Sequence, residues 1–205
     1  MSVWLKVCGL TQASSVDVAL AENVDAIGFV FAASPRRIEP KAALTLKRRI
    51  ERRAAVVAVM RHPTQAEIDD VLGTLEPDYL QTDAGDLDAL NVPDSVQILP
   101  VFRGRDVRKK APPRLLYEGA VSGAGELSDW SEARELTTRT QLILAGGLNP
   151  ANVTAAIATV QPFGVDVSSG VEARRGEKDA ELIRRFARAV HAAPAPWLTV
   201  KEPES

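Results

Sequence analysis

The sequence is poor in the residues that build disulfides and metal centres. Cysteine occurs once, as Cys8, so a disulfide framework is excluded. The two histidines, His62 and His191, are far apart, and neither has a cysteine nearby. Structural zinc sites gather four cysteine and histidine ligands. We therefore expect a protein without a metal site.

Long apolar segments and a strong charge of one sign are also missing. No apolar run approaches the roughly 20 residues that a membrane-spanning helix needs. The start, Met1 to Lys6, lacks the charged beginning and long apolar core of a signal peptide. A net charge of -2 gives no electrostatic reason to expect nucleic acid or an anionic membrane as a partner. We expect a cytoplasmic protein that binds neither.

The chain does contain a regular alternation of strand and helix patterns. Its 205 residues, 45% of them hydrophobic, suit a single ordinary domain. Strand patterns lie at 3–7, 25–31, 54–60, 78–83, 96–102 and 114–118, and two more begin near 142 and 164. Helix patterns lie at 11–22, 40–52, 64–72, 86–90, 128–136 and 178–191, with a further start at 149–150 and a poor, polar candidate at 103–111.

Eight such units predict the fold class. Alternation of strands and helices indicates an α/β protein with a parallel sheet and right-handed crossovers. Eight units favour a closed (β/α)8 TIM barrel over residues 1–192, followed by a Pro-containing tail at 193–205. An open doubly wound sheet is the alternative, but no Gly-x-Gly-x-x-Gly follows the first strand.

Two strand ends near the carboxyl terminus favour a phosphate site. The strand at Gly164 stops at Ser168-Ser169-Gly170, and the strand at Leu142 runs into Gly146-Gly147. Small residues after a strand leave backbone N–H groups open to an anion. A polar loop without a ligand is the alternative for either stretch alone. Together they match the phosphate site after strands seven and eight of a barrel. The sequence therefore predicts Gly146, Gly147, Ser168, Ser169 and Gly170 as phosphate-binding residues.

Other polar residues at predicted strand ends are candidates for chemistry. They are Cys8, Arg36, Asp83, Arg103, Glu118 and Asp166. Cys8 stands beside Lys6 and before a helix start, and both features lower the pKa of a thiol. The alternatives are an inert buried cysteine, a solvated loop arginine, and a carboxylate that is exposed or pairs with Arg36. A thiolate base and a carboxyl acid would suit proton transfer on a phosphosugar.

Five segments together resemble the phosphoribosylanthranilate isomerases of tryptophan biosynthesis. They are Lys6–Thr11, Asp25–Phe31, Ser34–Arg36, Leu144–Pro150 and Gly164–Glu172, in the right order over nearly the whole chain. The resemblance implies a barrel that catalyses an Amadori rearrangement of a small-molecule phosphosugar, N-(5-phosphoribosyl)anthranilate. It implies no cofactor and no metal.

The resemblance also implies roles for individual residues. Cys8 is similar to the general base that removes the C2 proton of the ring-opened Schiff base. Arg36 is similar to the residue that pairs with the anthranilate carboxylate. Asp166 is similar to a carboxylate near the sugar hydroxyls and the amine. Gly147, Ser168 and Ser169 are similar to parts of the phosphate cradle.

Two departures from the family's pattern concern the general acid. Strand four commonly carries Gln-Leu-His-Gly, where this chain has Gln81-Thr-Asp-Ala. Strand six commonly ends in Leu-Leu-Asp, where this chain has Tyr117 followed by Glu118. Because adjacent strand residues face opposite sides, Glu118 would have to reach over the barrel mouth. We expect Glu118 to be the acid, with Asp83 as second candidate.

Three functions remain open at this point. The first is the isomerase, and the second is another phosphosugar enzyme on the same barrel. The third is a non-catalytic or divergent phosphosugar-binding paralogue, kept open by the change in strand six. The assembly, monomer or homodimer, is also open.

Overall fold

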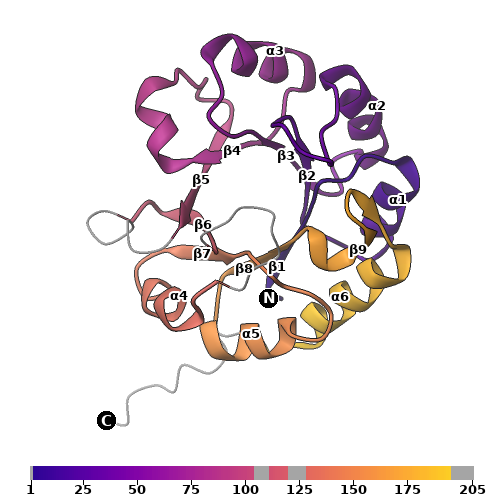
Figure 1. Cartoon of the computed structure of the whole chain (residues 1–205), viewed down its shortest axis with the longest axis vertical. Helices are drawn as coiled ribbons and strands as arrows, with labels where there is room; N and C mark the ends of the chain where they lie inside the picture. The colour runs from indigo at the N-terminus through magenta and orange to yellow at the C-terminus, as the bar shows by residue number, and fades with distance from the viewer. Residues whose placement is uncertain (1, 104–110, 120–127, 195–205) are drawn as a thin grey trace.

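Eight parallel strands close into a barrel in the computed structural model, which describes residues 2–103, 111–119 and 128–194 (Figure 1). The strands are β1 (Trp4–Cys8), β2 (Ala26–Val30), β3 (Ala55–Val59), β4 (Tyr79–Asp83), β5 (Gln97–Arg103), β6 (Arg114–Glu118), β7 (Gln141–Leu144) and β8 (Gly164–Val167). Each pairs with the next, and β8 pairs with β1 to close the ring. The predicted TIM barrel is confirmed, and an open sheet is excluded.

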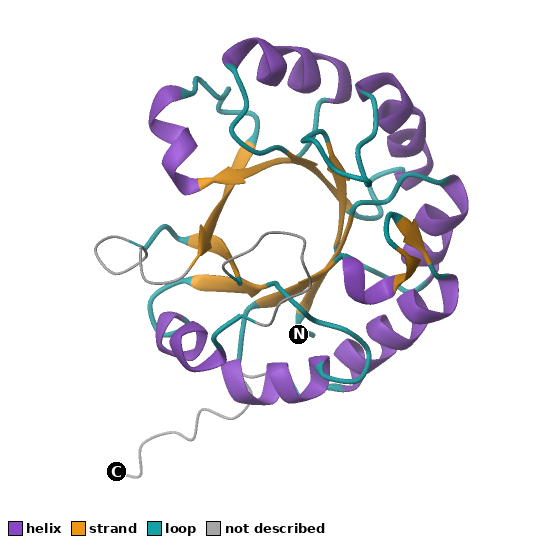
Figure 2. Ribbon diagram, viewed as in Figure 1, coloured by secondary structure: helices purple, strands orange, loops and turns teal. Residues whose placement is uncertain are grey.

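Helices cover the outside of the barrel (Figure 2). The α-helices are α1 (Ala13–Ala21), α2 (Pro40–Ile50), α3 (Gln65–Leu75), α4 (Trp130–Leu136), α5 (Val153–Val160) and α6 (Ala180–Ala192). Two 3-10 turns, η1 (Ala84–Ala89) and η3 (Ser169–Val171), follow β4 and β8. A hairpin of β9 (Glu172–Arg174) and β10 (Glu177–Lys178) lies between η3 and α6. None of the described helices has the length and apolar character needed to cross a membrane.

Several helix starts differ from the sequence-based expectation. α1 begins at Ala13, two residues after the predicted start at 11, and Gln12 before it makes no side-chain cap. α4 begins at Trp130 instead of at 128, because Asp129 caps it by accepting hydrogen bonds from the amides of Ser131 and Glu132. The Asn149–Asn152 turn holds its own side-chain hydrogen bonds, and α5 therefore begins only at Val153.

Three predicted features lie wholly or mostly outside the described residues. They are the polar helix at 103–111, the loop at 119–125 and the tail at 193–205.

The barrel has two apolar layers because its strands are buried on both faces. Residues such as Val56, Leu115 and Leu142 point outward and join the large cluster under the helices. A smaller cluster inside the barrel holds Leu99, Val101, Leu116, Ile143 and Ala145. Val and Ile fit such strands, because their branched side chains pack well on a pleated surface.

Aromatic and cationic side chains fill the amino-terminal end of the barrel. The rings of Trp4 and Phe163 stack with centroids 6.4 Å apart. The Arg114 guanidinium lies 4.6 Å above the Phe163 ring and donates to the Tyr79 hydroxyl at 2.9 Å. These residues open strands β1, β4 and β6 or directly precede β8. The carboxyl ends of the strands are therefore the end left for a ligand, as in other barrels of this fold.

Candidate active site

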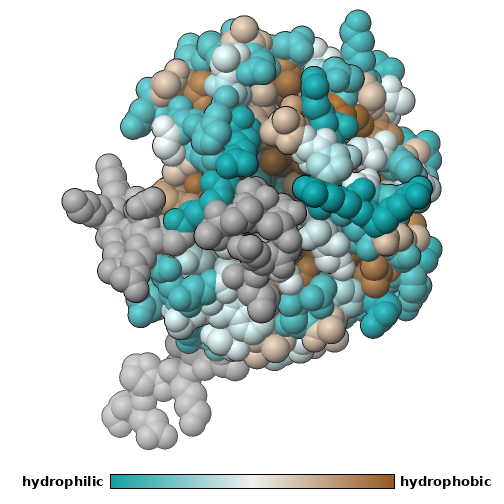
Figure 3. Space-filling view, in the orientation of Figure 1, coloured by the Kyte–Doolittle hydropathy of each residue, from teal (hydrophilic) through white to brown (hydrophobic). Residues whose placement is uncertain are grey.

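A cavity of about 300 Å³ opens at the carboxyl ends of the strands. Six of the predicted site residues line it, and they come from the loops and ends of five different strands: Cys8, Arg36, Asp83, Glu118, Asp166 and Ser168. Figure 3 shows hydrophilic residues around a hollow on the face that looks down the barrel. The fold thus brings together residues that are up to 160 positions apart in the sequence.

A thiol, an ammonium and a carboxylate form the innermost group. Lys6 is fully buried, and its Nζ donates to Asp166 Oδ1 at 2.8 Å. Cys8 lies two residues further along β1, on the same face as Lys6. A Cβ at Gly28 would lie 2.9 Å from the Cys8 sulfur, so strand β2 leaves room for the thiol only because it carries glycine there.

The charge state of this group differs from the sequence-based expectation. Burial raises the pKa of the Cys8 thiol above its ordinary value, although Lys6 and Lys178 act to lower it. Burial also acts to lower the pKa of Lys6, but Asp166 and Cys8 outweigh it and leave that pKa raised. The thiol pKa is therefore not lowered as the sequence predicts, because Cys8 is more completely buried than the sequence indicated.

Arg36 lies in a second charged group of the same cavity. Its Nε and Nη2 donate to the two carboxylate oxygens of Glu172 at 2.6 and 3.0 Å. Lys178 donates to the same carboxylate at 2.7 Å and to the Ser168 carbonyl oxygen at 2.9 Å. All three charged side chains are at most 7% exposed. Arg36 thus pairs with Glu172 and not with Glu118, its alternative partner in the sequence analysis.

The pKa of Glu172 reflects this surrounding charge. Burial alone would raise it, but the hydrogen bonds from Arg36, Lys178 and the Gly176 amide lower it to about 2. The carboxylate is therefore ionised at neutral pH and fixes Arg36 at the cavity wall.

The two predicted phosphate loops lie side by side. A Cβ at Gly170 would lie 1.9 Å from the Leu148 carbonyl oxygen, so the loop after β8 contacts the loop after β7 directly. Gly146 and Gly147 have φ angles of 90° and 64°, which side-chain-bearing residues rarely adopt. Within the described part of the chain, neither glycine donates its backbone N–H to a backbone acceptor.

Ser168 is the predicted phosphate residue that lines the cavity, whereas Gly146, Gly147, Ser169 and Gly170 are not among its described lining residues. The Ser168 hydroxyl donates to the Cys8 carbonyl oxygen at 3.1 Å. This contact joins the loop after β8 to the end of β1. The geometry favours a phosphate beside Cys8, at the β7–β8 side of the mouth.

Glu118 faces the mouth, and Tyr117 does not. Tyr117 is buried under α4, where its hydroxyl donates to Glu132 at 2.8 Å. Glu118 has the same orientation as Leu116, which packs inside the barrel. The glutamate therefore reaches the cavity without the chain turn that the sequence analysis required.

Arg103 lies between the two acid candidates. Its guanidinium donates to Asp83 and to Glu118, so the three side chains form one ion-pair group across the ends of β4, β5 and β6. The sequence analysis placed Arg103 among the polar residues at strand ends but assigned it no role.

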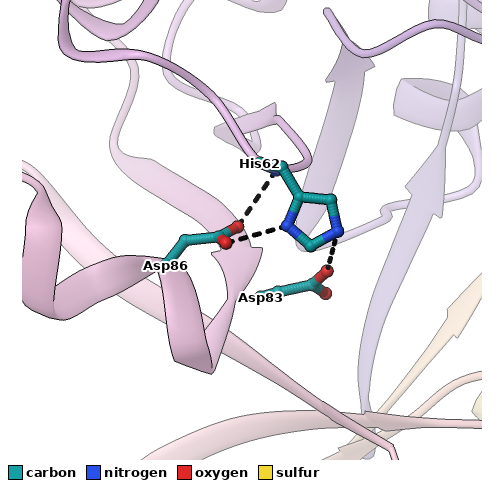
Figure 4. Close-up of side chains that lie close together, drawn as sticks. All are labelled: His62, Asp83 and Asp86. Atoms are coloured by element: carbon teal, nitrogen blue, oxygen red, sulfur yellow. Dashed lines mark hydrogen bonds and ion pairs between the residues drawn. The ribbon is translucent and has the colours of Figure 1, made fainter.

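His62, Asp83 and Asp86 form the group of described residues whose donor atoms are close enough to hold a metal ion (Figure 4). His62 Nδ1 lies 2.8 Å from Asp86 Oδ1, and its Nε2 lies 3.5 Å from Asp83 Oδ2. Hydrogen bonds from His62 and Thr82 lower the pKa of Asp86 against the opposing effect of burial. Asp83 is already paired with Arg103, so its negative charge is balanced by the protein itself.

Glu172, Lys178 and Gln81 belong to this site but were not among the predicted site residues. Glu172 stood in the motif of strand eight without a role, and Lys178 gave no signal beyond its charge. Gln81, on β4, was quoted only as part of a departure from the family's pattern. Their roles depend on contacts across 136 positions or on burial, which local sequence does not reveal.

Comparisons with known proteins agree with this geometry. Residues 5–189 match the family model described as N-(5'-phosphoribosyl)anthranilate (PRA) isomerase. The chain belongs to this isomerase family. A family member from Rhodopseudomonas palustris strain BisB5, named N-(5'-phosphoribosyl)anthranilate isomerase, is 35% identical over 94% of this chain and 98% of its own length. One of the same name from Streptococcus mutans is 33% identical over 91% of this chain and 97% of its own.

Solved structures of the isomerase family have the same barrel. The phosphoribosyl anthranilate isomerase of Thermotoga maritima superposes with a TM-score of 0.79 at 28% identity, covering 92% of this chain and 98% of its own. TrpF of Jonesia denitrificans gives 0.78 at 31% identity, covering 95% of this chain and 100% of its own. A further family structure contains reduced 1-(o-carboxyphenylamino)-1-deoxyribulose 5-phosphate, a phosphorylated sugar derivative.

Proposed function

We propose that this chain catalyses the Amadori rearrangement of N-(5'-phosphoribosyl)anthranilate to 1-(2-carboxyphenylamino)-1-deoxyribulose 5-phosphate. One observation carries the proposal beside family membership: a thiol on β1 and a carboxyl on β6 line the same cavity, next to paired loops suited to phosphate. The reaction needs a base and an acid on one sugar.

The first step is opening of the furanose ring. Glu118 gives a proton to the ring oxygen, and the bond between that oxygen and C1 breaks to leave a Schiff base. Arg103 holds the Glu118 carboxyl at the mouth and is shared with Asp83.

The second step is removal of a proton from C2. The Cys8 thiolate takes this proton, the C–H electrons form a C1–C2 double bond, and the C=N electrons move to the nitrogen of the Schiff base. The enol that results then loses its 2-hydroxyl proton and gains a proton at C1, which gives the ketone. Lys6 lies on the same face of β1 and favours the thiolate, while Asp166 holds Lys6 in place at 2.8 Å. Asp166 also lines the cavity and is assigned to the sugar hydroxyls or the amine.

Binding depends on two further groups. Arg36, held by Glu172, is assigned to the anthranilate carboxylate, for which its planar guanidinium is suited. Gly146, Gly147, Ser168, Ser169 and Gly170 are assigned to the phosphate, chiefly through backbone N–H groups. A cytoplasmic location and a monomer or homodimer remain the expectations from the sequence.

Turnover of fluorescent phosphoribosylanthranilate tests the function and the acid together. With the wild-type protein the fluorescence should decay. In Glu118→Gln the turnover number should fall by roughly 100- to 10,000-fold, the usual contribution of a general acid. Asp83→Asn keeps the shape of the second candidate, and its turnover number should fall less than that of Glu118→Gln.

Two outcomes would contradict parts of this assignment. A larger loss in Asp83→Asn than in Glu118→Gln would transfer the acid role to Asp83. Persistent fluorescence with wild-type protein that still binds the substrate would support the phosphosugar-binding paralogue instead.

A further inference from the structure

Buried polar atoms without a partner are concentrated in the cavity. Among the described residues, four side-chain nitrogen or oxygen atoms are buried and make no hydrogen bond: Gln81 Oε1, Arg103 Nε, Ser128 Oγ and Trp130 Nε1. The first two belong to cavity-lining residues on the neighbouring strands β4 and β5. Native proteins pair nearly all such atoms, so an unpaired acceptor and an unpaired donor in one cavity wall require an explanation.

The strand neighbours of Gln81 offer no donor to its amide oxygen. The residue is 7% exposed and is in register with Val59 on β3 and Leu99 on β5. Both neighbours are apolar, and the barrel interior beside β5 is filled by Leu99, Val101 and Leu116. An unpaired amide oxygen in such surroundings destabilises the folded protein. Its presence is explained if a ligand supplies the missing donor.

Arg103 is held in one orientation with its Nε unused. The terminal nitrogens of its guanidinium donate to Asp83 and Glu118, so the side chain is fixed from both sides. The Nε donor is buried without a partner. The wall therefore offers an unpaired acceptor on β4 and an unpaired donor on β5, and a sugar can meet such groups because each of its hydroxyls can donate and accept.

We propose that the Gln81 amide binds the 3-hydroxyl of the substrate's sugar. This inference rests on the proposed function, which identifies the ligand as a ribosyl phosphate. The rearrangement alters C1, the C2 position and the ring oxygen, and the phosphate occupies O5. The 3-hydroxyl is the sugar hydroxyl that passes through the reaction unchanged, and a fixed hydrogen-bonding group can therefore hold it throughout. Gln81 is a specificity-determining residue in this scheme.

The test compares stability with affinity in Gln81→Met. Methionine has a similar length and shape but no amide, so the variant removes the unpaired oxygen without leaving a large void. The urea midpoint should stay unchanged or rise, because an unsatisfied polar group has gone. The kcat/KM for phosphoribosylanthranilate should fall by at least tenfold. Gln97→Met, at an exposed position of β5 outside the cavity lining, is the matched control and should change neither.

A substrate without the 3-hydroxyl identifies the bond. With wild-type protein, kcat/KM should be at least tenfold lower for the 3-deoxy substrate than for the normal substrate. With Gln81→Met, the two substrates should differ little in kcat/KM. A site built to pair with a hydroxyl discriminates against ligands that lack it. Equal losses for the deoxy substrate in both proteins would overturn the inference. An unchanged kcat/KM in Gln81→Met would also overturn the inference. A lowered urea midpoint in that case would show that the amide has a purely structural role.

Binding of the reduced product analogue separates this inference from the proposed function. Calorimetry with reduced 1-(o-carboxyphenylamino)-1-deoxyribulose 5-phosphate measures affinity without turnover. If wild-type protein binds the analogue but does not convert substrate, the proposed function fails and the Gln81 inference is decided by the affinity of Gln81→Met. If wild-type protein binds neither the analogue nor the substrate, the proposed function and the Gln81 inference both fail.

Discussion

Replacement of Glu172 by glutamine should destabilise the protein in a way that depends on pH. The carboxylate is 4% exposed and joins Arg36 to Lys178. Its pKa lies at about 2 instead of 4.5, because the hydrogen bonds from these cations outweigh the effect of burial. At about 1.4 kcal/mol per pH unit, that displacement corresponds to at most about 3.5 kcal/mol of folding free energy.

The direction of the pH effect follows from the lowered pKa. The unfolded chain takes up the proton near pH 4.5, while the folded protein resists it until about 2. The contribution is therefore complete above the unfolded pKa and is lost as the pH falls from 4.5 towards 2. Glu172→Gln should lack this component. It also leaves Arg36 and Lys178 buried without their partner, a change that costs about 3 to 5 kcal/mol in buried ion pairs.

Urea unfolding at several pH values measures the effect. The difference in unfolding free energy between wild type and Glu172→Gln should be about 3 to 5 kcal/mol at pH 7 and should shrink as the pH approaches 3. Glu177→Gln is the matched control in the same hairpin, since its side chain is 44% exposed and pairs only at the surface with Arg174. It should change stability by less than about 1 kcal/mol. A difference for Glu172→Gln that is the same at pH 3 and pH 7 would refute the reasoning.

Two further changes test other parts of the site. Because burial raises the Cys8 pKa, the kcat/KM of the wild-type protein should increase with pH above neutrality. Cys8→Ser should lower kcat/KM by at least 100-fold and abolish this pH dependence. A pH-independent wild-type profile would contradict the assignment of the thiolate as base. Gly170→Ala would place a Cβ 1.9 Å from the Leu148 carbonyl oxygen, so the two phosphate loops should separate and KM should rise at least tenfold. Gly73→Ala, with open space around the new Cβ on α3, should leave KM unchanged and slightly raise the unfolding free energy.

The parts of the molecule that could be predicted from sequence are those with a local signal. Strand β3 is a run of Ala and Val, and such a run indicates a buried parallel strand wherever it occurs. Gly146 and Gly147 indicated a tight strand-to-helix turn, and both have positive φ. The order of eight such units was enough to predict the barrel and to place Cys8 and Ser168 at the same end.

The parts that could not be predicted depend on distant partners or on burial. Arg36 meets Glu172 across 136 positions, and no local pattern states that this pair forms. The sequence shows Lys6 beside Cys8 but not how dry the site is, and that dryness reverses the expected pKa shift of the thiol. The orientation of Glu118 needed the register of β6, in which Tyr117 is buried under α4.

The filled amino-terminal end of the barrel determines where ligands enter and leave. Trp4, Phe163 and Arg114 pack at this end, and apolar side chains fill the barrel interior. Substrate and product therefore both pass through the cavity at the carboxyl ends of the strands. Accumulated product then competes with substrate for the same cavity. The rate of turnover therefore depends on how quickly the next enzyme consumes the product.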